Sequence, residues 1–226
     1  PYLGIFLSGI PEGMKRDNIS VDMTLAEFYR YLLADGREPI LPYLNLSPDK
    51  QQIIARQTAV FLDDRMVGIL NRNQSMALMI LKGNMGNQRI AVEFPRKSPG
   101  GFHYATVLEE SRHRVKVMPQ INGDIVNFKV DVDMTMEIIE HTPSEATVIP
   151  PRLDELEHAI EKEYKERMEN VISKLQGYKT DAAGFGEYVR VKYPHFFNKE
   201  KWQEDFSKAK FDISVNINII RPGSTI

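Results

Sequence analysis

Residues 125–139 read IVNFKVDVDMTMEII, and their alternation decides the fold of the larger part of the chain. Apolar side chains stand at every second position, with Asn, Lys, Asp, Thr and Glu between them. This period of two predicts a strand with one face on a core and the other in water. Strands of parallel sheets are usually apolar on both faces, so the pattern favours an antiparallel neighbour. We expect residues 211–219, which alternate in the same way, to be that neighbour and to close the sheet.

The composition is that of an ordinary globular protein, with 226 residues, 42% of them hydrophobic and 27% charged. The formal net charge of −2 argues against a nucleic-acid partner, which would require a basic excess. The absence of cysteine excludes disulfides, a thiol nucleophile and a thiolate metal site. No apolar run is long enough to span a membrane. Because the chain opens on Pro1, we expect it to be a processed or truncated piece.

The first third of the sequence predicts a short helix and an edge strand. Thr24 and Glu27 have the spacing of a capping box, and Gly36 is placed to end the helix as C′. Residues 41–46 follow as a strand between prolines. We expect residues 1–56 to be the C-terminal part of a preceding, middle domain. The predicted buried stripe of the helix consists of Leu25, Phe28, Leu32 and Leu33.

Residues 57–226 predict a second domain with an antiparallel β-sheet covered by long amphipathic helices. The fold class is therefore α+β, preceded by part of a second, small α/β-type domain. Asn122-Gly123 is the strongest hairpin signal and leads into the long strand. The expected strands are residues 59–62, 66–70, 89–94, 102–109 and 112–118, and the expected helices are a segment capped by Asn71 or Asn73 and ending at Leu81, then 153–177, 184–192 and 199–209.

One basic stripe is the candidate site for a partner. Arg112, Arg114 and Lys116 alternate with inward-facing residues, so they should share the solvent face of their strand. Such a stripe can meet anionic lipid or an acidic partner, or it can pair across strands with the acidic positions of residues 131–137.

Other constellations are more typical of structure than of chemistry. Asp131, Asp133 and Glu137 line one face of the long strand, where carboxylates are usually solvated. Glu155 and His158 form one Glu-x-x-His, whereas a di-iron bundle site needs two. Neither glycine-containing turn, 83–86 or 184–186, has the Lys and hydroxyl of a phosphate loop. We therefore predict no catalytic residue, no metal ligand and no cofactor.

Several motifs follow one another in a fixed order, namely residues 59–70, 176–181, Gly184-Phe185-Gly186 and 202–206, followed by an alternating strand and Gly223. Together they resemble the Ger(x)C family, the C subunits of the nutrient germinant receptors of bacterial spores. The resemblance runs from about residue 57 to the end, and the tripeptide His195-Phe196-Phe197 departs from it where the family has a tryptophan.

The resemblance implies a non-enzymatic lipoprotein that works with the integral-membrane A and B subunits in the spore inner membrane. Its lipid sits on an N-terminal cysteine, so this chain is expected to be a soluble ectodomain without its anchor, on the outer face of that membrane. The expected role is to couple or scaffold the A and B subunits during germination. The alternative is a module that itself binds a small nutrient in a pocket of converging polar groups. A hydrolase is disfavoured because no nucleophile–base pair is visible.

Overall fold

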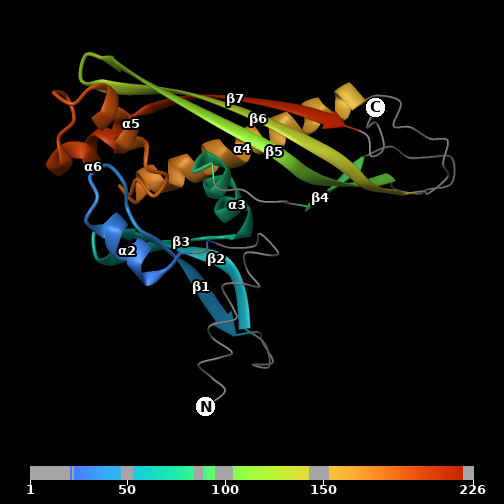
Figure 1. The fold of residues 1–226 in the computed structure, drawn as a ribbon, viewed down its shortest axis with the longest axis horizontal. Coiled ribbons are helices and arrows are strands. Elements are labelled where there is room, and N and C mark those ends of the chain that lie inside the picture. Colours follow the sequence, from blue (N-terminus) through green and yellow to red (C-terminus); the bar gives the residue numbers. More distant parts are fainter. Residues whose placement is uncertain are drawn as a thin grey trace.

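The computed structural model describes residues 21, 23–46, 53–83, 89–94, 104–142 and 153–220. Within these ranges the chain forms a long sheet and a small sheet with helices between them (Figure 1). This arrangement confirms the predicted α+β class. The elements are α2 (Leu25–Leu32), β1 (Ile40–Leu46), β2 (Ile53–Leu62), β3 (Arg65–Leu70), α3 (Arg72–Leu81), β4 (Arg89–Phe94), β5 (Tyr104–Asn122), β6 (Ile125–Thr142), α4 (Leu153–Gly177), α5 (Phe185–Lys192), α6 (Lys199–Lys208) and β7 (Lys210–Ile220).

The long sheet has the strand order β4-β5-β6-β7 and is built on the β5–β6 hairpin. The predicted turn at Asn122-Gly123 is confirmed, because Asn122 pairs with Ile125 and Gly123 has φ 61°, a left-handed conformation that glycine adopts easily. The strands expected at residues 102–109 and 112–118 are one strand, β5, as far as they are described. Two irregularities of register, between Val107 and Leu108 and between Glu110 and Arg112, bend β5 without ending it.

The direction predicted for the last strand was wrong. β7 is the neighbour of β6, but the two strands run parallel, with Asn127 opposite Lys210 and Glu137 opposite Ile220. After β6, helix α4 brings the chain back under the sheet, and α5 and α6 lie at the end where β6 starts, so β7 starts at that end too (Figure 1). The antiparallel neighbour of β6 is β5.

Helix α4 covers the inner face of the long sheet. Its bounds agree with the prediction, and its apolar stripe is buried, including Leu156, Ile160, Tyr164 and Met168. Two carboxylates of α4 also reach the free edge of β7. Glu161 Oε1 accepts a hydrogen bond from the backbone N–H of Ile217 at 3.0 Å, and Glu157 Oε1 accepts one from Ile219 at 2.8 Å.

The small sheet has the order β1-β2-β3 and is entirely antiparallel. The predicted capping box of Thr24 with Glu27 is present and begins α2. Of the two caps predicted for the next helix, Asn71 is the one that begins α3, where it forms a capping box with Gln74. Strand β2 begins at residue 53 and pairs with β1, so the proposed domain boundary at 56/57 falls within a paired strand. The division into residues 1–56 and 57–226 stays a prediction.

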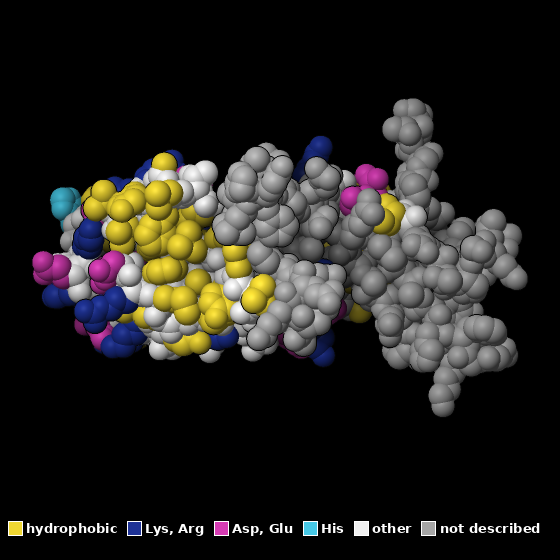
Figure 2. All heavy atoms as spheres, turned by 90° about the horizontal axis from the view of Figure 1, so that it is seen from below, with side chains coloured by type: hydrophobic (Ala, Val, Ile, Leu, Met, Phe, Trp, Pro, Cys, Tyr) yellow, Lys and Arg dark blue, Asp and Glu magenta, His cyan; other side chains and the backbone are white. Residues whose placement is uncertain are grey.

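The stripe predicted for α2 is not buried. Leu25 and Leu33 are 71% and 75% exposed, and α2 instead packs through Phe28, whose ring lies 5.2 Å from that of Phe61 near the end of the central strand β2. Figure 2 views this side, where hydrophobic side chains gather on the surface. Gly36 does not end α2 either, since the C-cap is Leu33.

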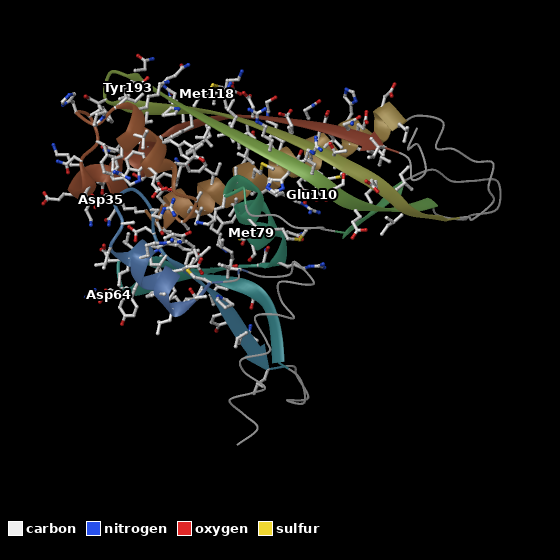
Figure 3. The ribbon with its side chains drawn as sticks, viewed as in Figure 1. Asp35, Asp64, Met79, Glu110, Met118 and Tyr193 are labelled. Carbon is white, nitrogen blue, oxygen red and sulfur yellow. The ribbon has the colours of Figure 1, made fainter. Side chains whose placement is uncertain are left out.

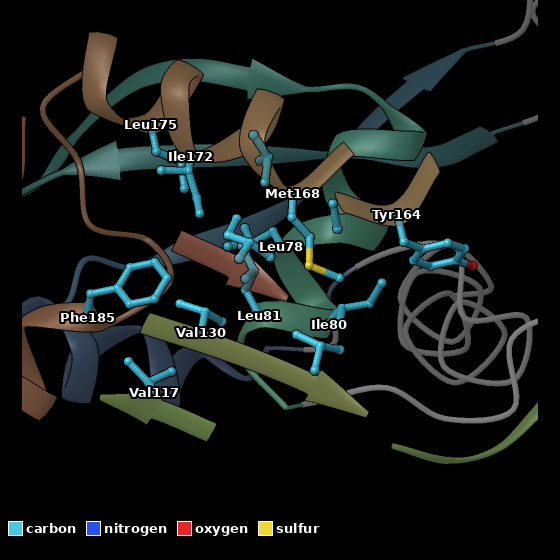
Figure 4. Close-up of a cluster of buried hydrophobic side chains, with 14 of the residues drawn as sticks. Leu78, Ile80, Leu81, Val117, Val130, Tyr164, Met168, Ile172, Leu175 and Phe185 are labelled. Carbon is cyan, nitrogen blue, oxygen red and sulfur yellow. The ribbon is translucent and has the colours of Figure 1, made fainter. Parts of the chain in front are cut away.

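A single cluster of buried side chains joins the two sheets. Val60 and Leu70 from the small sheet share it with Leu78 of α3 and with Val130 of the long sheet, and α4 runs through its middle (Figure 4). The packing between the layers is therefore continuous, and the face of the long sheet that α4 does not cover is its outer face.

Candidate interaction surface

The outer face of the long sheet, called the open face below, is a polar surface formed by three strands. Its residues are Arg112, Arg114 and Lys116 of β5, Asp131, Asp133, Thr135 and Glu137 of β6, and Ser214, Asn216 and Asn218 of β7. The three cations are exposed while Val117 and Val130 point to the core, so the predicted outward orientation is confirmed. Figure 3 draws the described side chains on the ribbon, with Glu110 and Met118 of β5 labelled. Their role as partner contacts remains a prediction.

Three residues form each rung across the open face. Arg114 lies opposite Asp133, which lies opposite Asn216, and Lys116 lies opposite Asp131. The expected basic-to-acidic juxtaposition across strands is therefore present in the register.

Asp133 and Asp131 nevertheless contact other side chains than the cations of β5. The Asp133 carboxylate accepts a hydrogen bond from Asn216 Nδ2 at 3.4 Å, and Asp131 lies 3.7 Å from the Lys129 ammonium. No carboxylate of the described part of the chain lies within 4.0 Å of Arg114 or Lys116. Both cations therefore keep free hydrogen-bond donors that point to solvent.

A groove runs along these rungs. It has a volume of about 370 Å³ and is open to solvent. Six of its seven lining residues have polar side chains, namely two cations, two carboxylates and two neutral groups, and the seventh is Val132. Pockets for small molecules are usually enclosed and mostly apolar, whereas this groove is neither. Its shape and chemistry suit an extended, charged surface.

The remaining candidates have structural surroundings. Among the described residues, no three His, Cys, Asp or Glu side chains are grouped closely enough to hold a metal ion. His158 Nδ1 lies 2.7 Å from the backbone oxygen of Asp154. His113 lies 2.8 Å from the buried Glu110 carboxylate, whose hydrogen bond raises the pKa of the imidazole. No described helix has the length and apolar composition needed to cross a membrane.

The sequence reasoning missed a buried polar junction, centred on Asp181. One carboxylate oxygen accepts the N–H groups of Gly184 at 2.8 Å and Phe185 at 3.0 Å. The other accepts the N–H of Gly186 at 2.7 Å and the indole Nε1–H of Trp202 at 2.9 Å. Burial raises the pKa of Asp181, and the four hydrogen bonds oppose that rise. An acidic residue just before a predicted helix start was the available signal, because a carboxylate there satisfies free N–H groups.

The same junction binds the segment after α2 to the segment before α5. The N–H of Glu38 donates to the Asp181 backbone oxygen at 3.0 Å, and the N–H of Glu187 donates to the Gly36 oxygen at 3.2 Å. A Cβ added to Gly186 would lie 2.6 Å from Gly36 Cα, so two glycines are needed for the backbones to meet. Arg37 and Glu187 form an ion pair across this contact.

Two titratable groups beside the junction have shifted pKa values. Burial raises the pKa of Glu38 to about 7. Burial and the nearby Arg37 lower the pKa of Lys82 to about 8, and the Lys82 ammonium donates to the Ala182 backbone oxygen at 3.0 Å. Neither group lines the groove of the open face, so we interpret the junction as structural.

The comparisons with known proteins agree with the sequence motifs. The family model "Spore germination B3/GerAC like, C-terminal" matches residues 56–223. Spore germination protein YndF of Bacillus subtilis (strain 168) is 29% identical over 163 residues, which cover 71% of this chain and 39% of the relative. Spore germination protein B3 of the same organism is 26% identical over 165 residues, covering 71% and 42%.

Two more distant comparisons extend over most of the chain. Spore germination protein GerQC of Bacillus cereus is 20% identical over 220 residues, or 97% of this chain and 59% of the relative. The crystal structure of the GerBC protein shares the fold, with a TM-score of 0.74 at 20% identity over 89% of this chain and 62% of that one. The chain thus spans about 40% to 60% of the length of the relatives it matches. Because the family model covers most of its length, the chain belongs to the spore germination B3/GerAC-like C-terminal family.

Proposed function

We propose that the chain is part of a non-enzymatic subunit of a spore nutrient germinant receptor and acts there through protein contacts. The family and the names of its relatives support a role in spore germination. In this proposal the subunit couples or holds the integral-membrane A and B subunits. It sits at the outer face of the spore inner membrane, held by a lipid on the full-length protein. Residues 57–226 are its C-terminal domain, and residues 1–56 end the domain before it.

The observation that carries this proposal is the open face with its free cations. Arg114 and Lys116 keep donors available although Asp133 and Asp131 lie directly opposite them. Fixed charges on a rigid sheet steer association and select partners more than they add affinity. A weak contact is sufficient in a membrane receptor, because anchoring raises the effective concentration of the partner.

The test is a charge reversal at the predicted contact. Arg112→Glu together with Arg114→Glu should slow nutrient-triggered germination while the melting temperature stays within a few degrees of wild type. The matched control is Lys162→Glu with Lys165→Glu, two exposed positions on α4 that change the net charge by the same amount. Equal germination defects from both pairs, or none from the first, would count against the open face as the contact.

One observation favours the alternative, a module that binds a small nutrient. The groove places Arg114 and Lys116 near Asp131 and Asp133, so it offers both charges that a zwitterion needs. Calorimetric titration with amino acids and sugars distinguishes the two proposals. We expect no heat of binding at millimolar ligand, because the groove lacks the enclosure that holds small molecules. A saturable isotherm at micromolar ligand would favour the nutrient-binding module.

A further inference from the structure

The open face carries two rows of opposite charge in direct register. The basic row is Arg114 and Lys116 on β5, and the acidic row is Asp133 and Asp131 on β6. Each cation shares its rung with one carboxylate. The two rows are adjacent strands of one sheet, so they lie about 5 Å apart.

This arrangement is complementary to itself. Consider a two-fold axis that lies parallel to the strands, midway between β5 and β6 and above the face. Rotation about it places the β5 of a second copy over the β6 of the first, without a shift along the strands. Arg114 of each copy then faces Asp133 of the other, and Lys116 faces Asp131. A two-fold axis across the strands would instead place each row over its own kind, so only the first axis brings opposite charges together.

The dimensions are compatible with this stacking. Sheets pack face to face about 10 Å apart, a distance that a long cationic side chain and a short carboxylate span together. A facing copy would supply the carboxylates that Arg114 and Lys116 lack among the described residues of their own chain. It would also bring Lys116 cations to the side of Asp131 that Lys129 leaves open.

We propose that the open face binds the open face of a second copy of this chain, related by that two-fold axis. The proposal rests on the proposed function in one respect, since it also takes this face to be a protein contact. The contact consists of solvent-accessible ion pairs and has no hydrophobic core. Its affinity is therefore low and depends strongly on the salt concentration. It forms where the chain is concentrated, as it is when held at a surface.

Sedimentation equilibrium tests this proposal directly. In about 0.02 M salt the mass should rise from monomer toward dimer as the concentration approaches about 1 mM, and about 0.5 M salt should abolish the rise. Arg114→Glu with Lys116→Glu should weaken association by more than about tenfold, because both rows are then acidic. Asp131→Lys with Asp133→Lys should do the same.

The decisive variant combines all four substitutions. It exchanges the two rows, keeps the net charge and restores self-complementarity, so association should return to within about twofold of wild type. Circular dichroism shows whether each variant is folded, and the two single-row variants test the proposal independently of the exchange. A wild-type chain that stays monomeric at all these concentrations would overturn the proposal, as would a row exchange that fails to restore association in a folded protein. If the chain is monomeric but Arg112→Glu with Arg114→Glu still impairs germination, the face contacts a different subunit and only the self-association is wrong.

Discussion

Replacing Asp181 by Asn tests whether the buried junction holds the layers together. The substitution keeps the size of the side chain and exchanges one acceptor oxygen for an NH₂ group, which only donates. Each oxygen of Asp181 accepts two hydrogen bonds, one pair from Gly184 and Phe185 and the other from Gly186 and Trp202. Whichever way the amide turns, two buried N–H groups face another donor.

The expected loss follows from those two groups. A buried donor without an acceptor costs about 1–3 kcal/mol, so two cost about 2–6 kcal/mol. Removing a buried charge offsets part of this cost. We therefore expect the free energy of unfolding to fall by about 3 kcal/mol, which is a large share of the stability of an ordinary domain.

Urea denaturation followed by circular dichroism measures this loss as a lower midpoint at an unchanged slope. Trp202→Phe is the matched background, because it removes only the indole donor of the junction. In that background the new amide can turn its NH₂ group toward Gly186, so that only one buried N–H group lacks an acceptor. Asp181→Asn should therefore lower the free energy of unfolding by about 1–2 kcal/mol less than it does in the wild-type background. A loss below about 0.5 kcal/mol in the wild-type background would refute the reasoning, and so would equal losses in both backgrounds.

Further outcomes follow from burial and charge. Val215→Asp places a carboxylate against the core and should cost about 3 kcal/mol, whereas the exposed Asn218→Asp should stay within about 0.5 kcal/mol; equal melting temperatures would contradict the inward face of β7. The pKa of Lys82 falls from 10.5 to about 8 on folding, so stability should rise between pH 8 and 10.5 by at most about 3 kcal/mol, a rise that Lys82→Met should remove from urea midpoints. The pKa shift of Glu38 acts on stability in the opposite direction. Its pKa rises from 4.5 to about 7 on folding, so its contribution to the free energy of unfolding is present below pH 4.5 and is lost as the pH rises through about 7. Glu38→Gln should flatten this part of the plot of urea midpoint against pH. Gly186→Ala drives a Cβ to 2.6 Å from the facing backbone and should lower the melting temperature by many degrees; an unchanged value would mean that the backbone contact is loose.

Local signals predicted most of the elements. The capping box at Thr24, the cap at Asn71 and the long stripe of α4 each depend on contacts within one turn or one face of the chain. The outward orientation of Arg112, Arg114 and Lys116 followed from alternation alone. These features could be predicted because neighbouring residues determine them.

The features that the sequence did not predict depend on contacts between distant segments. In the sequence Asp181 is an ordinary polar loop residue. Its role depends on hydrogen bonds from Gly186 of α5 and from Trp202, which only the fold brings to it. The exposure of Leu25 and Leu33 depends on where α2 packs against the small sheet, and the amphipathic pattern of the helix carries no information about that. Residues 1–20, which begin the expected preceding domain, and residues 102–103, which begin one expected strand, lie outside the described residues.

The wrong direction of β7 has a more general cause. Parallel strands are usually apolar on both faces because helices cover both sides of their sheet. Alternation of apolar and polar residues along a strand therefore indicates that one face of the sheet is exposed to solvent. It does not indicate that the neighbouring strand is antiparallel. In this sheet α4 covers the inner face only, and β6 and β7 alternate although they run parallel.

The same asymmetry determines how the sheet can make contacts. A free edge strand normally offers its backbone groups to another chain. On β7 the N–H groups of Ile217 and Ile219 are already bound by Glu161 and Glu157 of α4, so adding a strand there would first have to displace two carboxylates. Among the described residues, none blocks the open face in this way, and Arg114 and Lys116 keep free donors there. A partner of the long sheet is therefore expected to meet it face on, through side chains, and the charges of the rungs rather than backbone pairing would decide which partner fits.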